Sequence, residues 1–568
     1  MSAVLEAREP SARYWIETQP PLVREFDLLC SASDGTARLR ELILGLAIRG
    51  RLVPQLHDDE PAEELLARLR ASDSLNRKRG EVADLDIPLP ALPSGWVHCR
   101  LDDLAWPQAG FAFKSNGFNE AGAGLPLIRI RDVGSSNQPS TFFSGEFREE
   151  FLVKAGEWLI SMDGEFRVRR WHATDALLNQ RVTRLVFVSR EISQDFVAIA
   201  LQRQLTALQG SKAYTTVDHL SGKQIAGATI ALPPMEEQVR IVARVDELMR
   251  LCDALEAKGR LEAEQHARLL DTLLGTLTDS TTPEELAANW QRVAAHWDLL
   301  LDRPEAVDAL EQTVLQLAVR GLVVAQIPSE ESAQALMRRI TADREARVRV
   351  GGLRRISDSL SISEEDHPFE LPSGWIWARW NDIALQIGDI DHKMPAEVAG
   401  GVPYVSPRDF FGQNGIDFDG AKKIARSDFE ALARKIKPVR GDIIYPRYGT
   451  IGDVRLVEDD RDFLASYSCA VIKAYHGFVE PHFQHLLSLS DLIRRQAAAA
   501  TNKTTQPNVG LKSIQQFLVP LPPLAEQRRI VTRVTELRRL CADLRAHLAA
   551  QQTVQSQLAD ALVEQALA

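Results

Sequence analysis

The chain has 568 residues, of which 45% are hydrophobic and 26% are charged, and its formal net charge is −11. This length exceeds what a single hydrophobic core serves, so we expect several domains of ordinary soluble globular composition. Its five cysteines form no CxxC pair and no Cys/His cluster with metal-ligand spacing, which argues against a disulfide framework and a zinc site. Without a signal-like start or an apolar run of about 18 residues, we predict a cytoplasmic protein outside the membrane.

Two nearly identical stretches, 232–252 and 521–541, dominate the chain. Each runs from Leu-Pro-Pro through an acidic residue and a Gln into apolar residues spaced three and four apart, and the two coincide at an offset of 289 residues. This spacing predicts a long amphipathic helix of about 40 residues, or roughly 60 Å. A lone helix of this length has no core to cover, so we predict that the two helices pack against each other. The predicted seam comprises Ile241, Val245, Leu248, Cys252, Leu255, Leu269 and Leu273, matched by Ile530, Val534, Leu537, Cys541, Leu544, Leu558 and Leu562.

Other motifs repeat as well. A lead-in that starts with Arg-Gly ends at Gln55 (RGRLVPQ) and again at Gln326 (RGLVVAQ), and Leu-Pro-Ser-Gly-Trp begins at Leu92 and again at Leu371. The chain is therefore a tandem duplication with a period of roughly 270 to 290 residues, and each unit joins a helical lead-in, a mixed strand-and-helix domain and a long helix. We predict five regions: a lead-in (1–91), a first mixed domain (92–231, head 1), a central region with a long helix and second lead-in (232–370), a second mixed domain (371–520, head 2) and a C-terminal helix (521–568).

Motifs for covalent chemistry are missing from the sequence. It contains no GxxxxGK[ST], no GxGxxG after a strand, no HExxH and no GxSxG. The Leu-Pro-Pro pairs lack the polar residue of the Asn/Asp-Pro-Pro-aromatic motif of adenine methyltransferases. We therefore expect no catalytic residue, metal or cofactor in this chain.

The charge distribution singles out the heads. Head 1 has 15 basic and 14 acidic residues and head 2 has 18 and 17, so each carries +1 and the remainder carries −13. Near-neutral domains can present basic faces, and Arg and Lys at loop tips can neutralise phosphates or read bases. For each position the competing interpretation is a solvated loop or turn and capping chemistry. The candidate DNA-binding residues are Arg129, Arg131, Arg167, Arg169, Arg170, Lys212, Thr216, His219 and Lys223 in head 1, and Arg408, Lys422, Lys423, Arg447, Tyr448, Lys503, Thr505, Asn508 and Lys512 in head 2.

On the two Leu-Pro-Ser-Gly-Trp motifs, the two Leu-Pro-Pro helices and the lead-ins, the chain resembles the specificity subunit of type I restriction-modification enzymes from about Leu39 onward. The resemblance implies an α+β fold with two target-recognition domains separated by long helices that form an antiparallel coiled coil. It also implies that each domain reads half of a split site in double-stranded DNA, while the coiled coil sets the spacer. The implied partners are methyltransferase subunits, two in number, that use S-adenosylmethionine, and restriction/translocase subunits that use ATP and Mg.

The resemblance leaves some residues unassigned, chiefly 1–38 and 279–308. Two other functions stay open at this point. One is an acidic repeat scaffold that binds only proteins, and the other is a self-sufficient enzyme fused to its own recognition domains, which the missing motifs disfavour.

Overall fold

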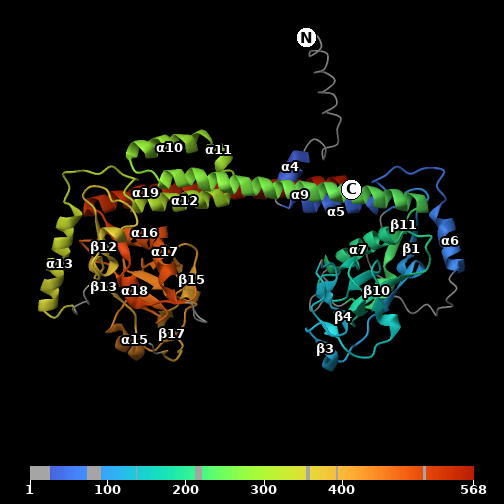
Figure 1. Cartoon of the computed structure of the whole chain (residues 1–568), viewed down its shortest axis with the longest axis horizontal. Coiled ribbons are helices and arrows are strands. Elements are labelled where there is room, and N and C mark those ends of the chain that lie inside the picture. The colour runs from blue at the N-terminus through green and yellow to red at the C-terminus, as the bar shows by residue number, and fades with distance from the viewer. Residues whose placement is uncertain are drawn as a thin grey trace, which may run out of the picture. The chain divides into compact units, whose positions relative to one another are not determined.

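The computed structural model describes residues 26–32, 34–72, 91–135, 137–210, 220–353, 359–391, 394–502 and 507–567. The chain divides into two compact units: Met1–Leu261 with Gln552–Ala568 (unit 1), and Glu262–Gln551 (unit 2). Each unit carries one head of short strands and helices beside longer helices (Figure 1). The predicted α+β fold with long helices is confirmed.

The described residues of head 1 form three sheets. The longest strand, β10, is the neighbour of both β2 and β7 in a four-stranded antiparallel sheet, and β4 and β9 form a parallel pair in a five-stranded sheet. Helices α7 (Gln194–Gly210) and α8 (Gly222–Gly227) pack on these strands. The strands are β1 (Val97–Arg100), β2 (Ala105–Ala109), β3 (Phe118–Asn119), β4 (Leu125–Ile128), β5 (Phe142–Phe143), β6 (Leu152–Val153), β7 (Trp158–Ser161), β8 (Val168–Arg170), β9 (Ala176–Leu178), β10 (Val182–Phe187) and β11 (Thr229–Leu232).

Head 2 repeats the four-stranded sheet as β13-β21-β18-β19 and surrounds it with smaller sheets. Its strands are β12 (Ile376–Arg379), β13 (Gln386–Gly388), β14 (Val402–Val405), β15 (Phe410–Phe411), β16 (Gly415–Ile416), β17 (Lys423–Ile424), β18 (Ile443–Pro446), β19 (Arg455–Leu456), β20 (Leu464–Ala465), β21 (Cys469–Lys473), β22 (Thr501–Asn502), β23 (Asn508–Val509) and β24 (Leu518–Leu521). Its helices are α14 (Trp380–Ile383), α15 (Arg426–Ala433), α16 (Pro481–Leu489), α17 (Asp491–Ala500) and α18 (Leu511–Gln515).

The chain enters and leaves each head through one antiparallel strand pair. In head 1, β1 pairs with β11 so that Val97 lies opposite Leu232, and in head 2, β12 pairs with β24 so that Ile376 lies opposite Leu521. The first strand follows the Leu-Pro-Ser-Gly-Trp turn, as predicted, and the second strand runs directly into Leu-Pro-Pro and the long helix. The first and last strands of each head therefore pair with each other.

The long helices are α9 (Met235–Thr278) and α19 (Leu524–Leu567), each of 44 residues or about 66 Å. In unit 1, Ile241, Val245 and Cys252 of α9 share a buried core with Ala559 and Val563 of α19. In unit 2, the last turns of α9 share a core with Cys541 of α19. The first part of each helix thus accompanies the last part of the other, which is antiparallel packing.

The predicted seam is wrong at Leu269 and Leu558, whereas Leu562 is buried as predicted and Leu273 is partly buried against the core of unit 2. Leu269 and Leu558 are 43% and 42% exposed, whereas Leu270 and Ala559 are buried. The prediction followed a strict heptad, but a straight helix drifts about 20° per heptad away from a 3.5-residue repeat. Four heptads after Ile241 the drift approaches the 100° between neighbouring residues, so the buried line moves on by one.

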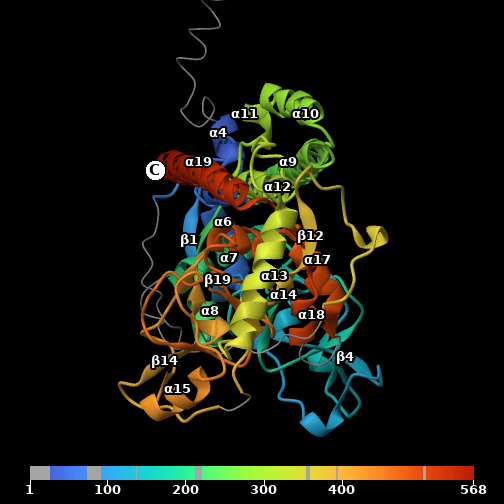
Figure 2. The same cartoon turned by 90° about the vertical axis from the view of Figure 1, so that its left-hand side faces the viewer.

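The lead-ins flank these helices. Helices α5 (Gly35–Ala47) and α6 (Ala62–Ser72) belong to unit 1, and α12 (Pro304–Val319) and α13 (Ala333–Arg349) belong to unit 2. Figure 2 shows α13 beside head 2, where Arg344 donates to the backbone oxygen of Ala384 at 2.5 Å. The remaining helices are α4 (Phe26–Ser31), α10 (Pro283–Ala295) and α11 (Trp297–Leu300). None of the helices in the described ranges is long and apolar enough to cross a membrane.

Candidate nucleic-acid interface

Arg131 and Arg408 occupy the same place in the two heads. Each lies in a one-turn 3-10 helix, Ile130–Asp132 in head 1 and Pro407–Asp409 in head 2, directly after the strand β4 or β14. Asp132 and Asp409 fix these turns by accepting, at 2.7 Å, the backbone N–H of the residue three positions earlier. The Asp is therefore structural, and the Arg before it is exposed on a fixed turn.

The other candidate in this loop of head 1, Arg129, is also exposed. Arg131 donates to the hydroxyl of Ser140 at 3.0 Å, a contact that solvent or a phosphate oxygen can replace. Arg131 and Arg408 are accordingly the candidates whose placement fits a phosphate or base contact best.

The basic strand β8 of head 1 lies beside this loop. A side chain at Gly134 would come within 3.0 Å of Cγ of Arg169, so the stem of Arg169 runs against the loop that follows Arg131. Arg169 donates to Oε1 of Gln202 at 2.9 Å, and burial together with the neighbouring Arg167 lowers the pKa of its guanidinium. The structure thus brings two of the predicted clusters together.

The neighbours of Arg169 are already paired. Arg167 forms an ion pair with Glu165 at 2.5 Å, and Arg170 forms one with Asp195 at 2.7 Å while its guanidinium carbon lies 5.1 Å from the ring centre of Trp158. Both pairs are partly exposed, and exposed pairs contribute little stability. A phosphate can therefore compete for Arg167 and Arg170, but they are not free donors.

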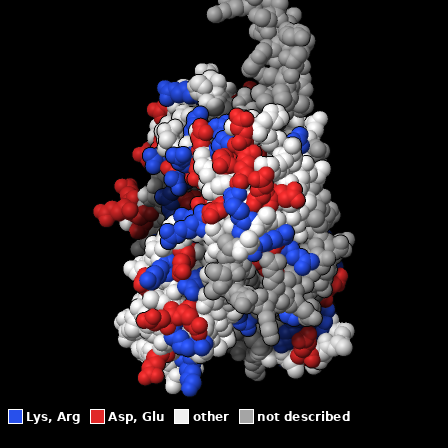
Figure 3. Space-filling model, turned by 90° about the vertical axis from the view of Figure 1, so that its right-hand side faces the viewer, with Lys and Arg blue, Asp and Glu red and all other residues white. Residues whose placement is uncertain are grey.

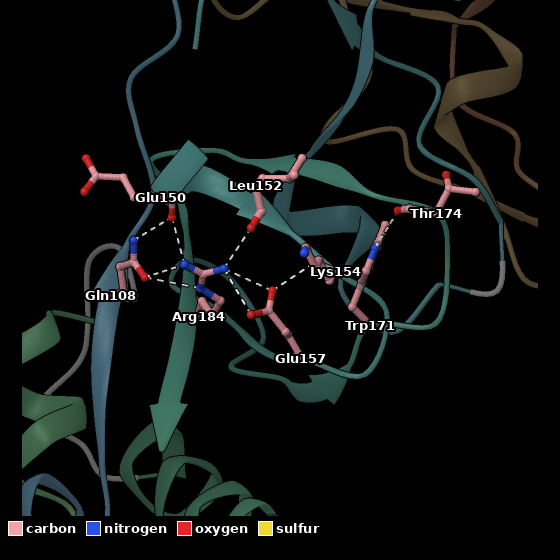
Figure 4. Close-up of polar contacts among 8 residues, drawn as sticks. All are labelled: Gln108, Glu150, Leu152, Lys154, Glu157, Trp171, Thr174 and Arg184. Atoms are coloured by element: carbon pink, nitrogen blue, oxygen red, sulfur yellow. Dashed lines mark hydrogen bonds and ion pairs between the residues drawn. The ribbon is translucent and has the colours of Figure 1, made fainter. Parts of the chain in front are cut away.

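A fork of hydrogen bonds from Arg184 fixes the adjacent part of head 1 (Figure 4). Arg184 donates to the backbone oxygens of Glu150 and Leu152 at 2.7 and 2.8 Å and to the carboxylate of Glu157 at 3.0 and 3.1 Å. Gln108 joins the fork by donating to the same Glu150 oxygen at 2.8 Å. Arg184 is therefore a structural cation, which its neutral, alternating strand sequence did not reveal.

This fork holds a segment with exposed cations that the sequence did not single out. Arg148 lies over the rings of Phe151 and Phe111, at 4.8 and 5.5 Å from their centres, and Lys154 is exposed. Both belong to an acidic stretch that includes Glu149 and Glu150, so neither stands in a basic cluster of the sequence.

The structure contradicts the surface position predicted for Arg447. Its side chain is 7% exposed, and its Nη1 pairs with Oδ2 of Asp389 at 2.5 Å. Sequence reasoning placed Arg447 at a loop tip, but it directly follows strand β18, two residues before Gly449, and is buried. Its neighbour Tyr448 is half-buried, 5.6 Å from the guanidinium carbon of Arg447, and forms a β-bridge with Asn508.

Lys422 and Lys423 are half-buried rather than displayed. Lys422 donates to the backbone oxygen of Pro395 at 2.6 Å, and Lys423 donates to the backbone oxygen of Phe418. These contacts tie β17 to neighbouring loops. The ammonium group of each lysine thus already donates to a backbone oxygen within the head, because a long Lys side chain can cross a strand to reach a distant carbonyl.

The last predicted cluster is described only in part. Lys212, Thr216, His219, Lys503 and Thr505 lie outside the described residues. Lys223 in α8 and Lys512 in α18 are exposed at equivalent places. The backbone N–H groups of Leu220 and Val509 donate to the backbone oxygens of Met162 and Arg447, at 2.7 and 3.0 Å, so these two described residues adjoin the strand-to-turn region of their own heads.

Charges are mixed on the surface of unit 1. Figure 3 shows Lys and Arg side chains interspersed with Asp and Glu over the described part of one face. No group of three or more His, Cys, Asp and Glu side chains in the described ranges is arranged to hold a metal ion. The described part of this face is therefore not uniformly basic.

Comparison with known proteins identifies what these heads are. Residues 93–265 and 372–551 each match the type I restriction modification DNA specificity domain, and together the two matches cover more than half of the chain. Two tandem domains of this kind define a DNA-binding recognition protein. The chain belongs to the family of type I restriction-modification specificity subunits, as the repeated motifs predicted.

Individual relatives can also be compared with the chain. The chain is similar to the type I restriction enzyme EcoAI and EcoEI specificity subunits of Escherichia coli, at 29% identity to each, with 94% of both chains covered in each comparison. Among solved structures, a chain studied for complex assembly and conformational transition of the type I R-M system aligns over 84% of this chain and 99% of its own. The identity is 17% and the TM-score is 0.45.

Proposed function

We propose that this chain recognises a bipartite DNA site, with one half-site read by each head and the unread spacer set by the paired long helices. The observation that supports this most directly is the duplication itself. Each specificity domain follows its own lead-in and continues into its own 44-residue helix. Two different heads in one chain would demand two half-sites, and linkage raises the effective concentration for the second contact.

We further propose that the long helices dock two methyltransferase subunits. Leu251 on α9 and Leu540 on α19 are 289 residues apart and are 55% and 57% exposed, although each directly precedes a buried Cys. In unit 2, Leu540 borders an apolar groove of about 1250 Å³ that is also lined by Trp290 and Leu537. Exposed leucines beside an apolar groove are typical of a protein interface, and their duplication fits two copies of one partner.

The chemistry would then belong to the partners. We propose that this chain is non-catalytic, that the methyltransferase subunits bind S-adenosylmethionine, and that restriction/translocase subunits use ATP and Mg. The acidic lead-ins and helices, which carry the whole charge deficit of the chain, suit protein partners better than phosphate.

Footprinting of the complex with its methyltransferase on a cognate duplex tests this proposal. Two protected patches with a less protected gap are expected. A single continuous patch, or equal protection of duplexes of any sequence, would contradict bipartite reading. DNA affinity that does not fall steeply with salt would instead support the protein-only scaffold.

A further inference from the structure

The three repeated motifs of the sequence meet at one point in each unit. In unit 1, the indole N–H of Trp96, from Leu-Pro-Ser-Gly-Trp, donates to Oε2 of Glu237 in the first turn of α9 at 3.0 Å. The amide of Gln55, at the end of the lead-in motif, donates to Oε1 of the same carboxylate at 3.4 Å and to the backbone oxygen of Gly50 at 2.6 Å.

Unit 2 builds the same arrangement from its own copies. The indole N–H of Trp375 donates to Oε2 of Glu526 at 3.1 Å. The amide of Gln326 donates to Oε1 of Glu526 at 3.2 Å and to the backbone oxygen of Gly321 at 2.7 Å. Heads that differ in most of their interior therefore share one attachment.

The glycine of each lead-in is required by this attachment. Gly50 and Gly321 have φ values of 65° and 74°, a left-handed conformation that disfavours residues with a side chain. A Cβ on either would also lie 2.8 Å from the Trp ring, Trp96 in one case and Trp375 in the other. The lead-in helix thus ends directly against the tryptophan that opens the head.

The Gln that follows each Glu forms hydrogen bonds with the head at a second place. Gln238 accepts the backbone N–H of Ser193, just before α7, at 2.9 Å, and Gln527 accepts that of Glu480, just before α16, at 2.8 Å. Both glutamines also donate to the first proline oxygen of their Leu-Pro-Pro motif at 2.9 Å. We call Trp96, Gln55, Glu237 and Gln238 junction 1, and Trp375, Gln326, Glu526 and Gln527 junction 2.

The carboxylate in each junction is buried, so the loss of a hydrogen bond to it is costly. Glu237 and Glu526 are 1% exposed, and burial raises the pKa of each carboxyl although the hydrogen bonds from Trp and Gln oppose that shift. A buried acid that loses a donor leaves a polar atom unsatisfied, so alternative orientations of the head are disfavoured. None of the junction residues is among the candidate DNA-binding residues.

We propose that the two junctions are positioning devices that fix the angle between each head and its long helix, and that Glu237 and Glu526 thereby set the spacer length the protein accepts. This inference rests on the proposed bipartite reading. A head with freedom to tilt on its helix would reach its half-site at more than one distance, while the residues that read bases stay unchanged.

The test compares Glu526→Gln with wild type in the complex with methyltransferase. The glutamine keeps the size of the side chain, but one of its two polar atoms is a donor, so it cannot accept from both Trp375 and Gln326. Trp375→Phe is a second variant that removes one hydrogen bond and keeps an aromatic ring. Glu536→Gln is the matched control, since Glu536 lies on the same helix in an exposed pair with Arg533. Binding is measured on duplexes whose half-sites are constant and whose spacer varies by single base pairs.

The proposal predicts that Glu526→Gln lowers the ratio of affinities between the best spacer and its one-base-pair neighbours by about tenfold. Tenfold is the change in affinity that corresponds to the loss of one hydrogen bond to a charged group. Half-site base preference and the Glu536→Gln control are expected to match wild type. A uniform fall in affinity over all spacers, or a spacer preference as sharp as wild type in folded Glu526→Gln and Trp375→Phe, overturns the positioning inference alone. A wild-type complex without any spacer preference overturns the bipartite reading itself.

Discussion

Arg447 and Asp389 form an ion pair inside head 2, with both side chains less than one-tenth exposed and 2.5 Å between Nη1 and Oδ2. Lys435 approaches the other oxygen of Asp389 at 3.3 Å from a more exposed position. The pair joins the loop after β13 to the end of β18, next to the turn that carries Tyr448. Arg447 accordingly holds this part of the head in shape.

We predict that Arg447→Ala destabilises head 2 by about 3 kcal/mol or more, because the substitution removes the buried cation that pairs with the carboxylate of Asp389. Thermal unfolding of the variant measures this change. In the double variant Arg447→Ala with Asp389→Asn, part of the stability should return, since no unpaired charge remains buried. A stable Arg447→Ala protein without base preference would show that Arg447 reads DNA after all.

The outcome at Arg447 illustrates what the sequence could and could not predict. Local patterns were sufficient for the duplicated architecture, the strands after the tryptophan turns and the long helices, because those follow from periodicity and turn chemistry. They could not separate an exposed Arg131 from a buried Arg447, since both precede turns. That difference depends on Asp389, which lies 58 residues away in the chain.

The repeated Glu-Gln stands out in the sequence only as part of a helix start. Its interaction with Trp96 or Trp375 and with the lead-in glutamine joins three distant segments, and no local rule predicts such an interaction. The helical seam was wrong at two of its positions for a different reason. A strict heptad was extended over a straight helix, so the prediction placed Leu269 and Leu558 inside and missed Leu270 and Ala559.

Arg131 and Arg408 are expected to contact DNA phosphates. Replacing either by Ala should weaken binding and reduce the slope of log affinity against log salt by about 0.9 for each phosphate that the variant no longer neutralises. Titrations at several salt concentrations measure the slope. Arg539→Ala serves as a control, because Arg539 is an exposed cation on α19 outside the heads. An unchanged slope and affinity in Arg408→Ala would remove that residue from the interface.

Leu251 and Leu540 are expected to bind one methyltransferase subunit each. A Glu at either position should weaken docking of one subunit by at least about tenfold, since the interface would have to bury a carboxylate in place of a leucine. Native mass spectrometry should then show one bound methyltransferase for each single variant and none for the double variant. Leu360→Glu is the control, because Leu360 is 64% exposed but lies outside the long helices. Full occupancy in the double variant would rule out these leucines.

His485 should make head 2 sensitive to acid. Burial, followed by the nearby Arg538, His482 and Arg455, lowers the pKa of His485 to about 3, whereas an ordinary histidine has a pKa of about 6.5. At pH values between about 3 and 6.5, His485 binds a proton in the unfolded chain but not in the folded chain. The stability that His485 contributes is therefore present above about pH 6.5 and is lost progressively as the pH falls toward 3.

Melting temperatures at pH 7.5 and pH 5.5 test this expectation. Wild type should melt at a lower temperature at pH 5.5, and His485→Leu should reduce the difference between the two pH values. His476→Leu is the matched control, because His476 is exposed in the same head and is not one of the groups that lower the pKa of His485. Equal pH sensitivity of wild type and His485→Leu would show that other groups dominate.

The central claim is that two heads read separate half-sites at a distance set by the helices. The most direct test inserts seven residues of helix-forming sequence after Leu261 in α9 and after Gln551 in α19, where the chain divides between the two units. Two extra turns lengthen each helix by about 10 Å, or about three base pairs. Mapping the methylated adenines in cells that carry the lengthened chain should show both half-sites unchanged and a spacer longer by about three base pairs. An unchanged spacer with methylation retained would contradict the claim.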